Sequence, residues 1–327
     1  MAACHAAWAD CQPNPPASGS TVTCTGPVPT STPLIAPGAT GVTVNINPDA
    51  QLVGTSGWLM QLGTGAQINN HGSIQAQGDT TLGLYVASGS TVRNFGTLSS
   101  NGVNALTVVT EGANVLLSNE AGGLITVTGT LAAGMLASET DGTTLINSGR
   151  IQLDAFEDGG LFSQFAKNTQ LINAQGGVIQ STLNEAFGLA AFTGTTHSLV
   201  NQGSITTQGE ASHGILLVGM TDSKVVNAGA ITTSGGSSEV LNRAYGIFVA
   251  ENSSGNSILN AVGGTITSSG LGSSGMAVLD SANNLLRNEG TLNVRGAGAQ
   301  GMYVVAGANN TLDNRGQLNI TGARGNG

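Results

Sequence analysis

The stretch that decides the fold is residues 144–151, TLINSGRI, in which aliphatic residues precede Asn147 and a turn through Gly149 leads to Ile151. The pattern Asn-x-Gly-x-Ile/Leu recurs along the chain, together with a longer variant, Asn-x-x-Gly-Gly-x-Ile. These motifs place ten asparagines 24 to 33 residues apart, at Asn70, Asn94, Asn119, Asn147, Asn173, Asn201, Asn227, Asn260, Asn288 and Asn314. A period of this length is typical of proteins built from stacked repeats.

A second glycine precedes a run of aliphatic residues between successive asparagines. It lies 13 residues before the asparagine in seven repeats, as Gly134 does before Asn147, and Ala105 takes its place once. The spacing from the asparagine to the next glycine varies more and is longest after Asn227, where residues 234–243 read as an inserted loop. Insertions at one point of the repeat indicate a constant cross-section with a loop at one corner.

Each repeat contains three short aliphatic stretches, bounded by Gly, Asn, Asp and Ser. Short β-branched and aliphatic runs between turn residues predict strands, and no stretch sustains a helical period. Three strands per repeat, stacked repeat on repeat, predict an all-β protein: a right-handed, three-sided parallel β-helix of about ten coils. At about 4.8 Å per stacked strand, the rod would be about 50 Å long.

Two columns of aliphatic residues are expected to fill the interior. The first follows the second glycine or its stand-in: Leu84, Leu106, Met135, Leu161, Leu189, Ile215, Ile247, Met276 and Met302. The second precedes the asparagine: Val92, Leu117, Leu145, Leu171, Leu199, Val225, Ile258, Leu286 and Leu312. Burying one such side chain contributes roughly 1.5–3 kcal/mol, so the columns together offset the entropy of ordering the chain.

The ten asparagines are expected to form an internal amide ladder, in which each side chain hydrogen-bonds to its copies in the coils above and below. The alternative, a ladder of ligands for a metal ion, is disfavoured because neutral amides bind metals poorly without carboxylates. We therefore assign the asparagines a structural role and expect no metal and no cofactor.

A strip of polar residues is expected on the outside of the rod, directly after the inward residue of each asparagine motif. Its ten members are all uncharged: Gln75, Ser99, Thr126, Gln152, Gln180, Thr206, Thr232, Thr267, Asn293 and Asn319. Stacked, they would form a flat face without like-charge repulsion, which suits self-association or adhesion. Alternatively, they are ordinary solvated β-strand residues.

A second outward strip follows the inward residue of the second-glycine motif. It comprises Tyr85, Thr107, Leu136, Phe162, Ala190, Leu216, Phe248, Ala277 and Tyr303. Apolar groups exposed in a row would suggest a contact surface. Alternatively, loops cover them, or the inward-outward assignment is shifted by one residue.

Composition excludes several classes of protein. The 327 residues carry 9 Lys and Arg against 18 Asp and Glu, a net charge of −9, so no basic surface is available for a phosphate backbone and nucleic acid is not an expected partner. No apolar run reaches the roughly 18 residues that a membrane-spanning helix needs. Intrinsic disorder is disfavoured because 39% of the residues are hydrophobic and only 8% charged.

The N-terminal region, residues 1–40, is rich in Pro, Ser and Thr and holds all three cysteines, Cys4, Cys11 and Cys24. We expect it to cap the first coil of a rod that spans residues 41–327, because an open strand edge invites pairing. An odd number of cysteines leaves one unpaired in an exported protein. A Cys11–Cys24 disulfide is favoured, since Cys24 lies in a strand-like segment, and Cys4–Cys11 is the alternative.

Signatures of enzyme chemistry are absent from the sequence, which contains no Gly-x-Ser-x-Gly, His-Glu-x-x-His or phosphate-binding glycine motif. The four histidines, His5, His71, His197 and His213, are scattered and expected at the surface. One carboxylate cluster stands out: Glu157 and Glu185 both lie three residues before their motif glycine, with Asp154 and Asp158 nearby. Two carboxylates about 5 Å apart suit a polysaccharide-cleaving site, but solvated loop charges are more common. We therefore expect no catalytic residues and no enzyme activity.

The glycine-rich, charge-poor coils with recurrent Asn-x-Gly-x-Ile turns resemble passenger domains of bacterial autotransporters, of the type V secretion system, and especially the pertactin-like and self-associating adhesins. The resemblance extends from Gly57 to about Ile320. It implies a virulence or biofilm factor, exported through a C-terminal β-barrel and displayed on the outer membrane or secreted. The alternating aromatic strands of such a barrel do not occur in this sequence, so we expect a truncated passenger without membrane insertion of its own.

The resemblance also implies the partners. We expect another copy of the protein on a neighbouring cell, giving cell aggregation and biofilm, or a host surface receptor or matrix protein. The alternative function is a polysaccharide-active β-helix enzyme that uses Glu157 and Glu185.

Overall fold

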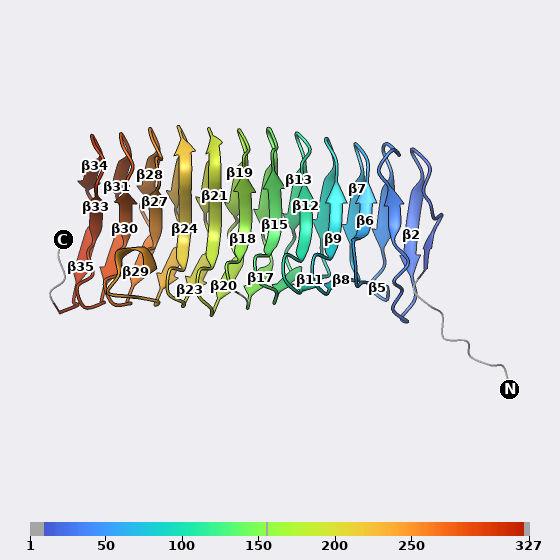
Figure 1. The fold of residues 1–327 in the computed structure, drawn as a ribbon, viewed down its shortest axis with the longest axis horizontal. Coiled ribbons are helices and arrows are strands. Elements are labelled where there is room, and N and C mark those ends of the chain that lie inside the picture. Colours follow the sequence, from blue (N-terminus) through green and yellow to red (C-terminus); the bar gives the residue numbers. More distant parts are fainter. Residues whose placement is uncertain (1–9, 155, 324–327) are drawn as a thin grey trace.

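The computed structural model describes residues 10–154 and 156–323. The chain forms a straight rod in which short strands stack coil upon coil from one end to the other (Figure 1). Apart from one turn of 3₁₀ helix, η1 (Val240–Asn242), every regular element in these residues is a β-strand. Three sheets run the length of the rod, which confirms the predicted all-β, three-sided parallel β-helix.

The first sheet, called here the asparagine sheet, carries the motif asparagines at the ends of its strands. Its order is β1 (Asp10–Gln12), β2 (Thr21–Thr25), β4 (Thr43–Ile46), β7 (Gln67–Asn70), β10 (Thr91–Asn94), β13 (Leu116–Asn119), β16 (Thr144–Asn147), β19 (Gln170–Asn173), β22 (Ser198–Asn201), β25 (Lys224–Asn227), β28 (Ser257–Asn260), β31 (Leu285–Asn288) and β34 (Thr311–Asn314).

The second sheet, the polar sheet, follows the turn after each asparagine. It consists of β5 (Gln51–Gly54), β8 (Ser73–Gln77), β11 (Thr97–Asn101), β14 (Leu124–Val127), β17 (Arg150–Leu153), β20 (Val178–Ser181), β23 (Ser204–Thr207), β26 (Ala230–Thr233), β29 (Thr265–Ser268), β32 (Thr291–Val294) and β35 (Gln317–Ile320).

The third sheet, the aromatic sheet, faces the viewer in Figure 1. It consists of β3 (Leu34–Ala36), β6 (Trp58–Leu62), β9 (Leu82–Val86), β12 (Leu106–Thr110), β15 (Ala133–Ser138), β18 (Gly159–Gln164), β21 (Phe187–Thr195), β24 (His213–Thr221), β27 (Ile247–Ala250), β30 (Met276–Leu279) and β33 (Met302–Val305).

The rod has twelve coils, two more than the approximate number that the motif asparagines indicate. Of the 13 strands in the asparagine sheet, only β1 is antiparallel to its neighbour, which leaves twelve stacked parallel strands from β2 to β34. The two additional coils escaped the sequence pattern because their strands lack the motif asparagine. Ile46 pairs with Asn70, and Cys24 pairs with Ile46, so aliphatic and sulfur side chains occupy the same column.

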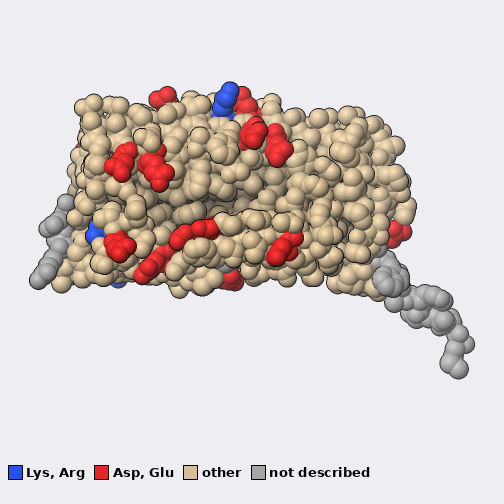
Figure 2. Space-filling model, in the orientation of Figure 1, with Lys and Arg blue, Asp and Glu red and all other residues tan. Residues whose placement is uncertain are grey.

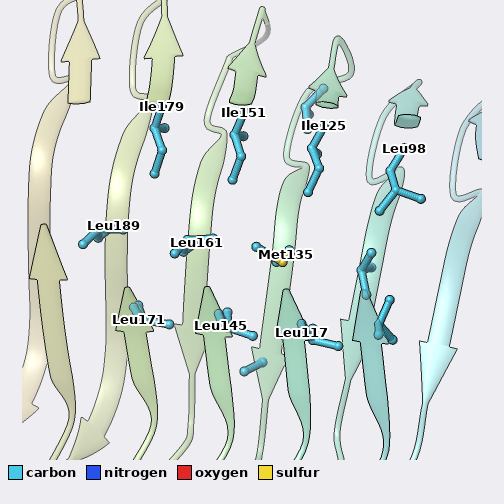
Figure 3. Close-up of a cluster of buried hydrophobic side chains, with 14 of the residues drawn as sticks. Leu98, Leu117, Ile125, Met135, Leu145, Ile151, Leu161, Leu171, Ile179 and Leu189 are labelled. Atoms are coloured by element: carbon cyan, nitrogen blue, oxygen red, sulfur yellow. The ribbon is translucent and has the colours of Figure 1, made fainter. Parts of the chain in front are cut away.

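The interior is a set of aliphatic columns contributed by all three sheets. Leu145 pairs in register with Leu117 and Leu171, and all three side chains are fully buried. Figure 3 shows these leucines pointing inward towards Ile151 of the polar sheet and Leu161 of the aromatic sheet. Strands such as β16 alternate half-buried and buried residues because successive side chains point to opposite faces of a strand.

Two assignments around Ala105 are wrong. The residue that pairs with Leu84 and Met135 in the interior is Val108, not Leu106, and Val109, not Thr107, pairs with Tyr85 and Leu136 on the outside. Ala105 does not take the place of the glycine, because Thr107 does: it is buried, and its hydroxyl donates to the Gly134 carbonyl of the next coil. Backbone pairing and the burial of Val108 set the register here.

The N-terminal end of the rod is closed by β1, which folds back antiparallel onto β2. A disulfide joins Cys11 to Cys24, and both sulfurs lie in the interior cluster. Parallel stacking begins at β2, within the segment for which the sequence predicts a cap. Cys4 lies outside the described residues. Among the residues that are described, no helix is long and apolar enough to cross a membrane.

Candidate functional site

The ten motif asparagines form one continuous hydrogen-bonded ladder at the corner between the asparagine sheet and the polar sheet. Each side-chain Nδ2 donates to the Oδ1 of the asparagine in the next coil, at 2.7–2.8 Å, from Asn70 to Asn314. Nδ2 of Asn201 also donates to the Ala230 carbonyl at 3.2 Å. Asn147, Asn173 and Asn201 are fully buried, which places the ladder inside the rod and out of reach of ligands.

The ten residues of the expected polar strip lie in one register column on the outer face of the polar sheet. Thr206 pairs with Gln180 and Thr232, and the column continues without a break from Gln75 to Asn319. Nine of the ten are half-buried and Asn319 is exposed. No member is charged, so the structure brings together a strip of uncharged polar side chains that spans ten coils, and the Arg150 guanidinium donates hydrogen bonds to two of them, Gln152 and Gln180.

Sequence reasoning missed a second outer column, on the asparagine sheet. Over five successive coils the outward residue is aliphatic and half-buried; this aliphatic stripe comprises Ile146, Ile172, Val200, Val226 and Leu259. The signal was available, since each of these residues directly precedes a motif asparagine. An outward row of Ile, Val and Leu is a candidate contact surface in its own right.

The outer face of the aromatic sheet carries two apolar clusters that are separate from the interior core. The expected second strip lies here, with Val109 in place of Thr107. Several members are buried rather than exposed, such as Leu216 and Phe248, while Tyr85, Phe162 and Tyr303 remain half-buried. Over β12, β15, β18 and β21 the face is hollowed into a groove of about 550 Å³.

Glu157 and Glu185 line one edge of this groove, on neighbouring coils, as their spacing predicted. Both residues have left-handed backbone, with φ of 59° and 56°. The pKa of Glu185 is raised because burial disfavours its charge and because Glu157 lies close enough to repel it. Two neighbouring carboxyl groups on one edge can bind a proton or a cation.

Asp154 and Asp158, expected near this pair, have different environments. Asp154 is exposed, whereas Asp158 is fully buried at a corner of the coil. Its Oδ1 accepts a hydrogen bond from the Ala132 amide at 3.1 Å, while Oδ2 has no partner. Burial, with a smaller contribution from Asp154, raises the pKa of Asp158 to about 8. The group is therefore a neutral acid at pH 7.

The prediction that the histidines lie at the surface is wrong for His197 and His213. His213 is buried among Phe187, Tyr245 and Phe248, and desolvation lowers its pKa to about 3.

His197 is also buried, and its ring is held by the Ser163 hydroxyl at 3.0 Å and the Thr195 carbonyl at 2.9 Å. His71 is exposed and stacks on Phe95, and His5 lies outside the described residues.

Metal-ligand chemistry finds no support in the described part of the chain, where no three His, Cys, Asp or Glu side chains are grouped so that they could hold an ion.

Comparison with known proteins identifies the family. Residues 34–255 match the family described as the BigA third pectate lyase-like domain, a span that covers more than half of the chain and includes the whole groove. The chain belongs to this family. Its membership confirms the autotransporter passenger-type β-helix that the repeated motifs predicted.

Among solved structures, the chain is similar to the fragment described as TibC-catalyzed hyper-glycosylated TibA55-350. The sequence identity is 14%, the alignment covers 95% of this chain and 98% of the fragment, and the TM-score is 0.19. At that score the superposition is too poor to transfer residues or ligands between the two. No curated protein matches the chain.

Proposed function

We propose that this domain is the rod of a surface-displayed autotransporter adhesin and that it mediates cell adhesion and cell-to-cell self-association through the polar strip. The observation that supports this most directly is the register column from Gln75 to Asn319, which presents uncharged hydroxyl and amide groups along ten coils. Membership of a passenger-type β-helix family supports display outside the cell.

The polar sheet suits contact with a second copy of itself. Its strip is flanked by further outward columns, in which Arg150, Asp154 and Arg295 are the only charged residues from β8 to β35. With so few charges, two such faces can approach with little like-charge repulsion, and each amide or hydroxyl offers both donor and acceptor groups. Individual contacts would be weak, but a rigid rod aligns many of them at once, which suits a two-fold antiparallel pair of rods.

The partner is therefore a copy on a neighbouring cell or a receptor or matrix protein on a host surface. An exported location agrees with the Cys11–Cys24 disulfide, because disulfides persist in oxidising compartments. Aggregation of cells through such contacts would lead to biofilm growth.

Charged substitutions in the strip test the proposal. A variant with Thr206→Glu, Thr232→Glu and Thr267→Glu should lose concentration-dependent self-association in analytical ultracentrifugation and should slow the settling of bacteria that display the protein. The matched control is Gln170→Glu, Ser198→Glu and Ser257→Glu, which adds the same charge to outward positions of the asparagine sheet.

A third variant separates the two candidate faces. Ile172→Lys, Val200→Lys and Val226→Lys disrupt the aliphatic stripe and leave the polar strip intact. If self-association survives the threonine substitutions and is lost in this variant, the contact lies on the asparagine sheet and the polar strip has no part in it.

The alternative function is polysaccharide cleavage by Glu157 and Glu185, favoured by their position at the edge of a groove. Their position on the same edge of the groove, on neighbouring coils, favours binding over catalysis. Glycan turnover that disappears in Glu157→Gln/Glu185→Gln would support the enzyme, and inactivity of the wild type on a broad glycan panel would dismiss it.

A further inference from the structure

The groove on the aromatic sheet is a built feature with an apolar floor. Eight of its 13 lining residues are apolar, and these include Leu136, Phe162 and Phe187. Phe162 and Phe192 meet edge to face with ring centres 4.9 Å apart, which fixes the shape of the floor. Leu131 stands at the edge with 47% of its surface exposed. Apolar side chains of another molecule could pack on a surface of this extent and be removed from water.

Acidic residues line both sides of this face. Glu157 and Glu185 precede β18 and β21, whereas Glu139, Glu251 and Asp280 follow the other ends of strands β15, β27 and β30. Figure 2, which views the same face as Figure 1, shows a hollow along the rod with acidic groups on both sides and few basic ones. None of the lining residues is Lys or Arg.

The position of the two groove glutamates is unfavourable for the protein alone. The same corner has left-handed backbone in neighbouring coils, at Asn104, Leu131 and Ala211, so the backbone conformation belongs to the fold. The stacking of two like charges at this corner is particular to Glu157 and Glu185. Like charges held on adjacent coils at the edge of an apolar groove are an arrangement that a cationic ligand would compensate.

Charge defines the kind of occupant. An apolar floor beside paired carboxylates complements a molecule that combines apolar side chains with cations. A second copy of this chain does not fit that description, because only 9 of its 327 residues are Lys or Arg. Nucleic acid has the wrong sign of charge.

We propose that the groove is a second binding site, distinct from the polar strip, that takes a cationic amphipathic peptide segment of a partner protein. Aromatic or aliphatic side chains of the segment lie on Leu136, Phe162 and Phe187, and a Lys or Arg bridges Glu157 and Glu185. The rod thus has one face for self-association and another for a basic partner.

The test uses the whole chain and a synthetic, labelled dodecapeptide of Lys, Leu and Phe whose apolar and cationic residues segregate to opposite sides. We expect saturable binding by fluorescence anisotropy and calorimetry. Glu157→Gln/Glu185→Gln should weaken binding by about tenfold or more. Leu131→Asn should weaken it several-fold, and this change favours folding because Asn accepts the left-handed backbone that Leu131 adopts.

Glu251→Gln/Asp280→Asn is the matched control, since it removes two acidic residues that also have left-handed backbone and lie on neighbouring coils but outside the groove. This variant should bind the peptide within about twofold of wild type. Equal weakening by both double variants would reduce the effect to general charge attraction and overturn the proposal. So would undiminished binding of an analogue with Glu in place of Lys, or saturable binding of an uncharged oligosaccharide with none of the peptide.

Discussion

Asp158 makes fewer hydrogen bonds than the polar residue at the equivalent corner of another coil. Ser212, two coils further on, occupies the equivalent corner, where its hydroxyl accepts from the Ala186 amide at 3.1 Å and donates to the Leu183 carbonyl at 2.9 Å. Asp158 reproduces only the accepting half of this arrangement, through the Ala132 amide. Its second oxygen is buried without a partner, and the pKa rises to about 8 for that reason.

Asp158 should make the rod less stable as pH rises. Its pKa is about 8 in the fold against 3.8 for the ordinary group, so the folded state holds an extra proton between these values. The free energy of unfolding therefore falls as pH rises from about 4 to about 8. Asp158→Ser should remove this slope and be more stable than wild type at pH 8, by roughly 1–3 kcal/mol in urea unfolding.

The control for this measurement is Glu210→Gln, at an exposed position, which should keep the slope of the wild type. Identical pH profiles for Asp158→Ser and wild type would mean that the carboxyl is already ionised in the fold at neutral pH.

The amide ladder holds together the corner between the asparagine sheet and the polar sheet. From Asn70 to Asn288, each side-chain amide donates one hydrogen bond to the asparagine of the next coil and another to a backbone carbonyl, so none of these buried amides lacks a partner. Gly203, in the turn after Asn201, has no room for a side chain, because a Cβ there would lie 2.1 Å from the Gly177 carbonyl oxygen. The motif thus combines a ladder residue with a glycine that permits close coil stacking.

Asn201→Ala should destabilise the rod by about 1–3 kcal/mol. The substitution leaves the Asn173 amide and the Asn227 carbonyl oxygen buried without their 2.8 Å partners. Thermal and urea unfolding measure the loss, and the adjacent exposed substitution Gln202→Ala should stay within about 0.5 kcal/mol of wild type. A loss no larger than that of the control would show that the ladder contributes little to stability.

For the whole molecule, stacking makes the rod close to one-dimensional, because each coil contacts mainly the coils before and after it. A terminal coil has only one neighbour and needs another means of stabilisation. We propose that the N-terminal region, residues 1–40, caps the rod through β1, and the Cys11–Cys24 bridge that ties β1 to β2, the first parallel strand, supports this.

Removing the disulfide should loosen only the N-terminal end. A bridge that closes a loop of this length contributes about 3 kcal/mol. In Cys11→Ser/Cys24→Ser, amide hydrogen exchange should therefore accelerate in β2 and β4, while β19, β22 and β25 stay protected as in wild type. Wild-type protein treated with a reductant serves as the control and should behave in the same way. Acceleration spread evenly along the rod would show that the coils unfold as one unit.

The sequence by itself determined the architecture, because a fixed cross-section forces matching residues into every repeat. The strands, the Asn70–Asn314 ladder and the Leu145 and Ile151 columns could all be predicted from that periodicity. The two first coils could not, since Cys24 and Ile46 fill the asparagine column without the motif. Nor could Val108, whose register depends on pairing with both neighbouring coils.

Only the tertiary structure decided which outward residues meet. The groove combines Leu131, Phe162 and Phe187 from three coils with Glu157 and Glu185, and the burial of His213 depends on Tyr245, which lies beyond the inserted loop. Inward positions repeat because the core constrains every coil alike. Outward positions vary from coil to coil, so their chemistry arises from neighbours that are 24 to 33 residues apart in sequence and about 4.8 Å apart in space.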